Sequence, residues 1–259
     1  MDVWKPENPN GLGIIIIQGS GWYRDLDYDA TQLKSPRNGM PKLFEAFTDA
    51  GYTLFSINHR AATRFRYPAA VEDAKRAVRF VRYNAKKFGI DSDKIGVFGG
   101  SSGGHLALLL GTLDDIKISD VIQTIETTSS KVQCIVAWYP PTNLNKMNTP
   151  KVIGTLVSFM GFETENDTSS YQYKTFVEAS PISHVTADDP PVLFVHGDAD
   201  DIVPFEQSES MCNVLKKNGI DTKLITIHGG THSRTFEGAI NPPDFISETI
   251  DWFNQHLRE

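Results

Sequence analysis

Short runs of β-branched and other apolar residues alternate along the chain with segments of helical periodicity. Six of these runs are predicted strands: Gly13–Gln18, Thr53–Asn58, Ile95–Phe98, Val132–Trp138, Val192–His196 and Thr222–Ile227. Most of them are apolar throughout, which is typical of strands that are covered on both faces. The runs therefore predict a buried, mostly parallel sheet.

Two segments show the three- and four-residue spacing of an amphipathic helix. In the first, which lies between the second and third runs, the apolar positions are Val71, Ala74, Val78, Val81, Ala85 and Phe88. This spacing predicts one long helix that stops at Gly89. The second segment covers 246–257 and follows two prolines that set up a helix start. Strands alternating with helices predict an α/β fold, a mostly parallel doubly wound sheet with helices on both faces.

The length of 259 residues and the 40% hydrophobic content fit a single domain over 1–259. Two segments, Leu113–Lys131 and Pro141–Ser180, do not follow the strand–helix alternation. The second is rich in Thr, Ser, Asn and Tyr, and we expect residues 141–180 to be a cap-like insertion. Within it, "VIGTLVSFMGF" predicts one short apolar helix that covers a pocket.

Charge and termini narrow the class of partner. A net charge of -7 without any Lys/Arg run argues against nucleic acid or an anionic membrane as a partner, and favours a neutral small-molecule substrate. The start "MDVWKPENPN" lacks a basic segment followed by an apolar one, and Ile14–Ile17 is too short to span a bilayer. We therefore expect a soluble protein and favour the cytoplasm. Cys134 and Cys212 imply no disulfide framework.

The most informative motif is "FGGSSGGH" at 98–105. It contains G-x-S-x-G between a predicted strand and a predicted helix, the setting in which a sharp turn lifts a serine hydroxyl clear of the backbone. Ser101 is then the nucleophile, and Ser102 begins the helix and offers its N–H to an oxyanion. Side chains at 99 and 103 would collide with the neighbouring strand and helix, hence the glycines. A phosphate loop is disfavoured because the octet has neither a GK[ST] ending nor GxGxxG spacing.

A serine nucleophile needs an acid and a base, which follow in the order Ser, Asp or Glu, His in this architecture. Three aspartates crowd the end of the fifth predicted strand in "VLFVHGDADDIVP". Asp200 is the preferred acid because it lies past the His-Gly corner, where a carboxylate can turn back toward the sheet. Asp198 and Asp201 are expected to bond local backbone N–H groups.

The preferred base is His232, which lies on the loop after the sixth strand, with His228 at the strand end as the alternative. The other histidines are expected to be structural or solvated. Two glycines separate His228 from His232 and no Glu follows the first, so a helical zinc pair is not predicted. We expect no metal and no cofactor.

The loop "QGSGWY" after the first predicted strand supplies the fourth element. Its Ser20 and Gly21 N–H groups are expected to join that of Ser102 in an oxyanion hole. A Gly-Ser-Gly-Trp turn is weak evidence on its own, but its place at the carboxyl end of a parallel strand is where such sites gather.

These segments together resemble the α/β-hydrolase superfamily, and specifically its small carboxylesterases of the hormone-sensitive-lipase-like and acetylxylan or feruloyl esterase type. The resemblance runs from "IIIIQGSGW" through "GGSSGGHLALLL" and "VLFVHGDADDIVP" to "HGGTHS". It implies a serine esterase that acts on esters of small acids, such as acetyl or feruloyl groups on sugars, and it supports Asp200 as the acid. Gln18 and Ser20 replace a histidine and a glycine of the family's His-Gly-Gly-Gly loop. The family also has strand sequence ahead of Asp2, so we expect a truncated or compact form.

Aromatic residues after two predicted strands are candidate substrate contacts: Trp22, Tyr23, Trp138 and Tyr139. Core packing at strand ends is the alternative for the second pair. Two other functions stay open. A peptidase is possible because "HGDADDIVP" also resembles prolyl-oligopeptidase-like enzymes, although the chain has no room for their propeller. A non-catalytic binding module is favoured only by the altered oxyanion loop.

Overall fold

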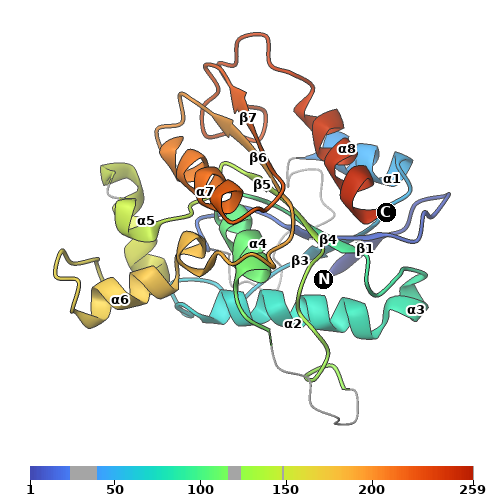
Figure 1. Cartoon of the computed structure of the whole chain (residues 1–259), viewed down its shortest axis with the longest axis horizontal. Helices are drawn as coiled ribbons and strands as arrows, with labels where there is room; N and C mark the ends of the chain where they lie inside the picture. Colours follow the sequence, from blue (N-terminus) through green and yellow to red (C-terminus); the bar gives the residue numbers. More distant parts are fainter. Residues whose placement is uncertain (24–39, 116–123, 148, 259) are drawn as a thin grey trace.

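The computed structural model describes residues 1–23, 40–115, 124–147 and 149–258. Within these residues a seven-stranded sheet has the strand order β1-β3-β2-β4-β5-β6-β7 (Figure 1). The strands are β1 (Asp2–Trp4), β2 (Gly13–Ile17), β3 (Thr53–Ile57), β4 (Ile95–Gly100), β5 (Cys134–Trp138), β6 (Val192–Gly197) and β7 (Thr222–Ile227). All neighbours pair in parallel except β1, which is antiparallel to β3. The six predicted strands are confirmed, and β1 is the strand that the sequence pattern missed.

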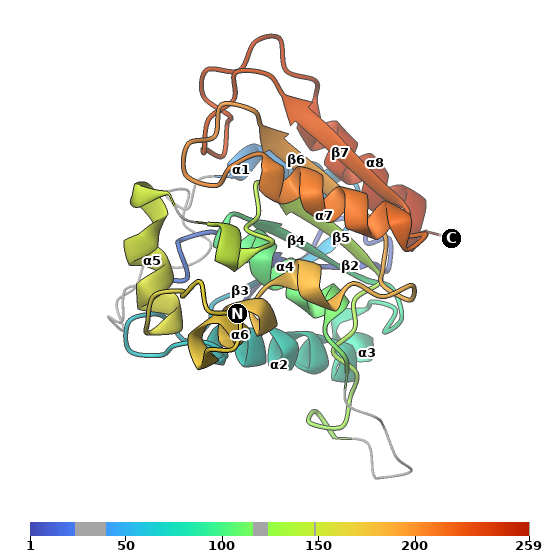
Figure 2. The ribbon, with the colours of Figure 1, turned by 60° about the vertical axis from the view of Figure 1, so that its left-hand side comes forward.

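Helices cover both faces of the sheet. They are α1 (Pro41–Asp49), α2 (Ala69–Tyr83), α3 (Ala85–Phe88), α4 (Ser102–Thr112), α5 (Pro150–Met160), α6 (Tyr171–Glu178), α7 (Glu206–Lys217) and α8 (Phe245–Leu257). One face packs against α1 and α8, and the other against α2, α4 and α7 (Figures 1 and 2). The predicted fold class, a mostly parallel doubly wound α/β sheet, is confirmed.

The two apolar cores follow from the alternation of side chains along each strand. On β2, Ile14 and Ile16 belong to the cluster under α1 and α8, whereas Ile15 and Ile17 belong to the cluster under α2, α4 and α7. All four side chains are fully buried. Burial on both faces explains why the central strands have no polar alternation.

The prediction of one long helix through Phe88 is wrong, because helical geometry is interrupted at Asn84, between α2 and α3. Asn84 has φ -100° and ψ 14°, and its side-chain amide donates to Phe80 O at 2.8 Å. Such a local side-chain bond competes with helix continuation. The apolar spacing carries on into α3, which ends at Gly89 with a left-handed φ of 75°.

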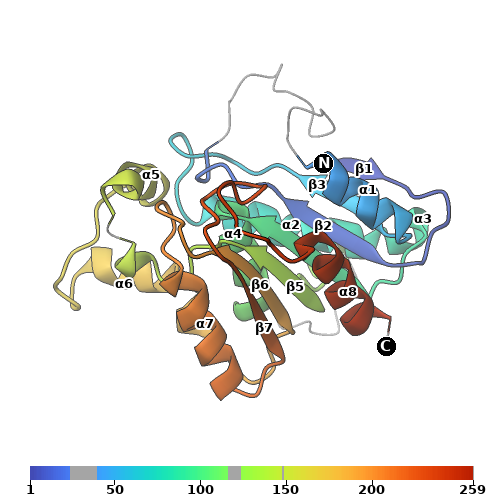
Figure 3. The ribbon, with the colours of Figure 1, turned by 90° about the horizontal axis from the view of Figure 1, so that it is seen from above.

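The segment 141–180 contains a 3₁₀ turn, η2 (Leu144–Lys146), followed by α5 and α6. A further 3₁₀ turn, η3 (Pro181–His184), leads back to the sheet. Seen from above, α5 and α6 lie together at the side of the molecule opposite to α3 (Figure 3). The apolar helix predicted from "VIGTLVSFMGF" corresponds to α5. Of the other irregular segment, residues 116–123 lie outside the described residues.

Candidate active site

A sharp turn joins β4 to α4 and places Ser101 at its tip. Ser101 has φ 53° and ψ -128°, a left-handed conformation that costs energy in a non-glycine residue. A Cβ on Gly99 would lie 2.2 Å from Gly103 O, and one on Gly103 would lie 2.0 Å from Ile17 O. Both distances are prohibitive, which confirms the reason for the glycines that flank the turn.

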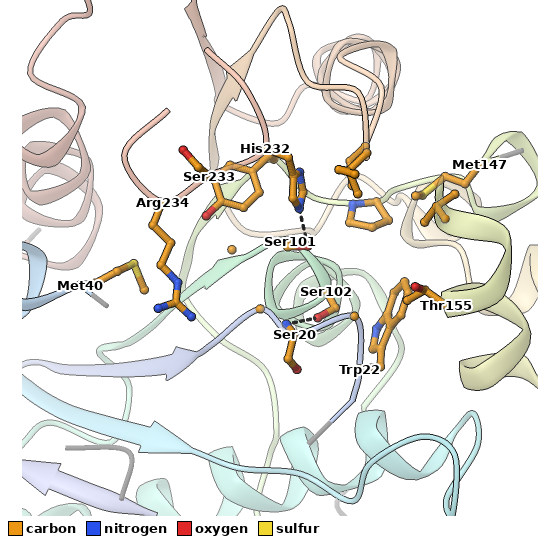
Figure 4. A pocket seen from close by; sticks show the side chains of 18 residues that line it. Ser20, Trp22, Met40, Ser101, Ser102, Met147, Thr155, His232, Ser233 and Arg234 are labelled. Atoms are coloured by element: carbon orange, nitrogen blue, oxygen red, sulfur yellow. Dashed lines mark hydrogen bonds between the residues drawn. The ribbon is translucent and has the colours of Figure 1, made fainter. Parts of the chain in front are cut away.

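Ser101 is the first member of a hydrogen-bonded chain of three side chains. Its Oγ lies 2.9 Å from His232 Nε2 (Figure 4), and His232 Nδ1 lies 2.6 Å from Asp200 Oδ2. Ser101 follows β4, Asp200 follows β6 and His232 follows β7, so the segments after the carboxyl ends of three strands bring these side chains together. The structure therefore brings together the three residues that the sequence suggested as nucleophile, acid and base.

The Asp200 carboxylate is held by a dense set of donors. Its side chain is fully buried, and Oδ1 accepts the backbone N–H groups of Ile202 and Val203, each at 2.9 Å. His196 Nε2 approaches Oδ2 to 3.3 Å. Burial alone would raise the pKa of Asp200, but the hydrogen bonds from His196 and His232 outweigh it and leave the pKa well below its usual range. Asp200 is therefore an anion at neutral pH.

The competing candidates point elsewhere. Asp198 accepts from His228 Nδ1 at 2.8 Å and from Gly229 N at 2.7 Å, so it holds the loop after β7 rather than the local turn that we expected. Asp201 forms an exposed ion pair with Lys151 of α5. His228 is largely exposed and bonded to Asp198. None of these side chains is hydrogen-bonded to Ser101 or His232.

The loop after β2 lies against the turn that carries Ser101. A Cβ on Gly19 would lie 2.4 Å from Gly100 O, so only glycine permits this approach. Ser102 opens α4, and neither its N–H nor that of Gly21 has a hydrogen-bond acceptor among the described residues. The N–H of Ser20, expected to face an oxyanion, instead donates to Ser102 Oγ at 3.0 Å (Figure 4).

A cavity of about 450 Å³ opens above Ser101. In Figure 4, Met147 and Thr155 lie on one side of Ser101, and Arg234, Ser233 and Met40 lie on the other. Thr155 belongs to α5, so the segment 141–180 forms one wall, and residues of the loop after β6 continue it.

Two of the four predicted aromatic contacts line this cavity. Trp22 is only 1% exposed, because its ring stacks on Phe159 of α5 at 4.3 Å and its Nε1–H donates to His105 Nδ1 at 3.1 Å. Tyr139 has a left-handed φ of 39° and packs edge-on against the His232 ring at 4.7 Å. Burial raises the pKa of the Tyr139 phenol above its usual value, so the hydroxyl stays protonated.

The other two aromatic residues are not brought to the cavity, contrary to expectation. Trp138 points into the core under α1 and α8, where its Nε1–H donates to Thr249 Oγ1 of α8 at 3.2 Å. Tyr23 is 52% exposed and is not part of the cavity wall. The core-packing alternative therefore holds for Trp138.

Several wall residues carried no signal in the sequence. Met40 lies immediately before α1, and Arg234 lies two residues after His232; both line the cavity. Neither belongs to a recognisable motif. Val152 and Thr155, in contrast, fall in the apolar segment predicted to cover a pocket.

The described residues also bear on two other classes of site. No cluster of three or more His, Cys, Asp or Glu side chains suited to a metal ion was found there. In the same part of the chain, no helix is both long and apolar enough to cross a membrane.

Comparison with known proteins decides the family. The BD-FAE family model matches residues 1–215 of this chain. The chain belongs to the BD-FAE family. Its fold is that of the α/β-hydrolase esterases, as the structural neighbours below show.

Among curated proteins, Esterase LipC of Mycobacterium tuberculosis is 33% identical over 221 residues, which cover 83% of this chain and 52% of LipC. This BD-FAE chain thus spans about half the length of the curated relatives it matches. Among solved structures, a truncated carbohydrate esterase from gut microbiota superposes with a TM-score of 0.78 at 28% identity, covering 99% of this chain and 90% of that one. An acetyl ester-xyloside bifunctional hydrolase from Caldicellulosiruptor lactoaceticus gives 0.76 at 26% identity, covering 97% and 85%.

Proposed function

We propose that this BD-FAE protein is a serine esterase that hydrolyses short-chain acyl esters, with Ser101 as nucleophile, His232 as base and Asp200 as the orienting acid. The observation that carries the proposal is the chain of hydrogen bonds from Ser101 to His232 at 2.9 Å and on to Asp200 at 2.6 Å, at the floor of a cavity. A hydroxyl bonded to a base that a third group orients is the arrangement that activates serine. The esterase names of LipC and of the gut carbohydrate esterase support the same class.

In the first half of the reaction, Ser101 Oγ bonds to the ester carbonyl carbon while its proton passes to His232 Nε2. The carbonyl electrons move onto oxygen, and N–H groups at the start of α4 and in the loop after β2 stabilise that oxyanion. The Asp200 anion stabilises the imidazolium. Collapse breaks the ester bond, and His232 returns its proton to the leaving alkoxide.

The second half repeats these steps with water. His232 takes a proton from the water as its oxygen adds to the acyl carbon, and Ser101 leaves with the proton back on Oγ. The free acid and the original enzyme result, so no redox partner or metal ion is needed. The helix N-terminus at Ser102 favours the negative charge in both halves.

The wall formed by the insertion favours small acyl groups. Met147 and Val152 are nearly fully buried and face the cavity from the segment of η2 and α5, and Trp22 closes it below. We expect acetyl to butyryl esters to be the best substrates, because a longer chain must displace this apolar wall.

The opposite end of the cavity combines polar side chains with Met40 and suits the leaving alcohol. Ser233 and Arg234 lie there, on the far side of Ser101 from Met147 (Figure 4). A sugar hydroxyl or an aromatic alcohol fits such an environment better than an alkyl chain does. The carbohydrate esterase and the acetyl ester-xyloside hydrolase, by their names, support acetylated sugars as the substrate class.

A hydrolysis panel tests this proposal. It compares 4-nitrophenyl acetate, butyrate and decanoate with acetylated xylan, methyl ferulate and a peptide 4-nitroanilide, each also with the Ser101→Ala variant as control. We expect turnover of the two short esters and of acetylated xylan, all abolished in the variant. Preferential cleavage of the anilide would identify a peptidase instead, and a protein that leaves every ester intact would refute the esterase.

A further inference from the structure

Two side chains of α4, the helix that follows the nucleophile, accept hydrogen bonds from the oxyanion loop after β2. Ser102 and His105 are three residues apart on α4 and therefore share one face of the helix. Ser102 Oγ accepts the N–H of Ser20 at 3.0 Å, and His105 Nδ1 accepts the indole N–H of Trp22 at 3.1 Å. The two donors, Ser20 and Trp22, flank Gly21 in the sequence.

His105 has the tautomer that is needed to accept the hydrogen bond from Trp22. His105 is fully buried, and its Nε2 lies 2.7 Å from Ala179 O at the end of α6. A carbonyl oxygen only accepts, so Nε2 carries the ring proton and Nδ1 is left as the acceptor that Trp22 requires. Burial lowers the pKa of His105 to about 4, so the ring stays neutral and keeps this acceptor at ordinary pH.

The backbone of the oxyanion loop is strained at Trp22, so the two hydrogen bonds from this loop to α4 help to hold its conformation. Trp22 has a left-handed φ of 56°, unusual for a bulky side chain, and Gly21 has φ 63°. A Cβ at Gly21 would lie 2.8 Å from Thr155 Cγ2 of α5, so this crowding adds to the preference for glycine that the positive φ already sets.

The side chain of Ser20 does not hold the loop. Its Oγ is buried with no hydrogen-bond partner among the described residues. In Figure 4 this side chain points away from Ser101 and His232, while the backbone N–H meets Ser102. Because that N–H is engaged, Gly21 and Ser102 supply the N–H groups that remain for an oxyanion.

We propose that Ser102 Oγ and His105 Nδ1 form a two-point clamp that fixes Gly21 N–H as the loop's donor to the oxyanion. This inference rests on the esterase function proposed above. Both side chains are positioning residues, since they act through Ser20 and Trp22 rather than on the substrate. The clamp replaces the arrangement expected from the sequence, in which Ser20 N–H is itself a donor.

Kinetics of Ser102→Ala provide the first test. Loss of one oxyanion donor lowers kcat about 10²- to 10³-fold, so a donor that is only less well placed should cost about tenfold. We expect kcat on 4-nitrophenyl acetate to fall about tenfold with KM within about twofold, and the affinity for a trifluoromethyl ketone to fall like kcat. A merely structural role would spare both the ketone affinity and kcat of the folded fraction.

Matched variants sharpen this test. Thr112→Val removes another buried hydroxyl of α4, one that donates to Leu108 O at 3.1 Å far from the loop, and should leave kcat unchanged. His105→Asn keeps an acceptor near Trp22 and should lose less activity than His105→Leu. A folded Ser102→Ala protein with kcat equal to or above wild type would overturn the clamp, since the hydroxyl would then be neutral or compete for the Ser20 donor.

Amide hydrogen exchange tests the clamp without any turnover. By NMR, we expect the Ser20 amide to be protected in the wild type and to exchange at least about tenfold faster in Ser102→Ala, with Thr112→Val unchanged. Equal exchange of this amide in wild type and Ser102→Ala would refute the tether. A protein that hydrolyses no ester yet shows the protection would refute the esterase proposal while leaving the Ser102 tether supported, so the two failures are distinguishable.

Discussion

Replacing Asp200 by Asn should disable the site without disturbing the fold. Oδ1 of Asp200 accepts two backbone N–H groups, those of Ile202 and Val203, which can only be satisfied by an oxygen. An Asn side chain must therefore keep its carbonyl oxygen at this position and direct its NH₂ group at His232 Nδ1. That NH₂ is a donor, so the imidazole must carry its own proton on Nε2 and cannot accept one from Ser101.

The expected size of the effect follows from this tautomer switch. Exchange of the acid for its amide in a Ser-His-Asp site lowers kcat about 10⁴-fold. Each factor of ten corresponds to about 1.36 kcal/mol, so the barrier rises by about 5.4 kcal/mol. The fold should survive, because the backbone N–H groups of Ile202 and Val203 keep their acceptor.

The assay is kcat on 4-nitrophenyl acetate, with thermal unfolding as the check on folding. Asp198→Asn is the matched control, since Asp198 is partly exposed and, among the described residues, bonds His228 and the Gly229 backbone rather than His232. The control should keep kcat within about twofold of wild type. If a folded Asp200→Asn protein kept a tenth of the activity, or if Asp198→Asn were equally damaging, the tautomer argument would be wrong.

Three further predictions concern stability and specificity. Because the pKa of buried His105 is about 4 in the folded state against about 6.5 unfolded, only the unfolded chain takes up this proton between those pH values. The free energy of unfolding should therefore fall as pH drops through this window, by about 3 kcal/mol in total. Urea titrations at a series of pH values give this free energy, and its slope against pH should be smaller by one proton in His105→Asn than in the wild type. An unchanged slope would contradict the neutral buried ring. Met147→Ala shortens a side chain of the cavity wall and should raise kcat/KM for hexanoyl relative to acetyl esters. The change in this ratio should correspond to about the 1–3 kcal/mol of transition-state binding that one or two methylenes contribute. An unchanged ratio would place the acyl group elsewhere. Trp22→Ala should instead cost about 3–5 kcal/mol of stability, since the ring is packed on Phe159 and bonded to His105, and a variant as stable as wild type would contradict this packing.

The sequence predicted the sheet well because its strands are buried on both faces. Uninterrupted apolar runs such as Ile14–Ile17 occur only where neither face meets water, and β1 was missed because three half-buried residues are too short to show a pattern. The break at Asn84 was also invisible, since the apolar spacing continues through it while one side-chain bond diverts the backbone.

The site was predictable where a motif constrains the backbone and unpredictable where packing decides. Gly99 and Gly103 leave room for no side chain, so Ser101 could be placed at the tip of the turn from sequence alone. Trp138 was left open between a substrate contact and core packing, although its alternation with Val136 and Cys134, which face α8, could have assigned it to that core. The bond between Ser20 and Ser102 joins residues 82 positions apart, and no spacing rule reveals it.

The central claim, that Ser101 is the activated nucleophile of an esterase, is tested most directly by intact-protein mass spectrometry after treatment with a 4-nitrophenyl phosphonate. We predict one phosphonyl adduct, located on Ser101 by peptide mapping, with loss of 4-nitrophenyl acetate hydrolysis in proportion to labelling and no adduct on Ser101→Ala. An adduct on Ser102, or labelling that persists in the Ser101→Ala protein, would contradict the account.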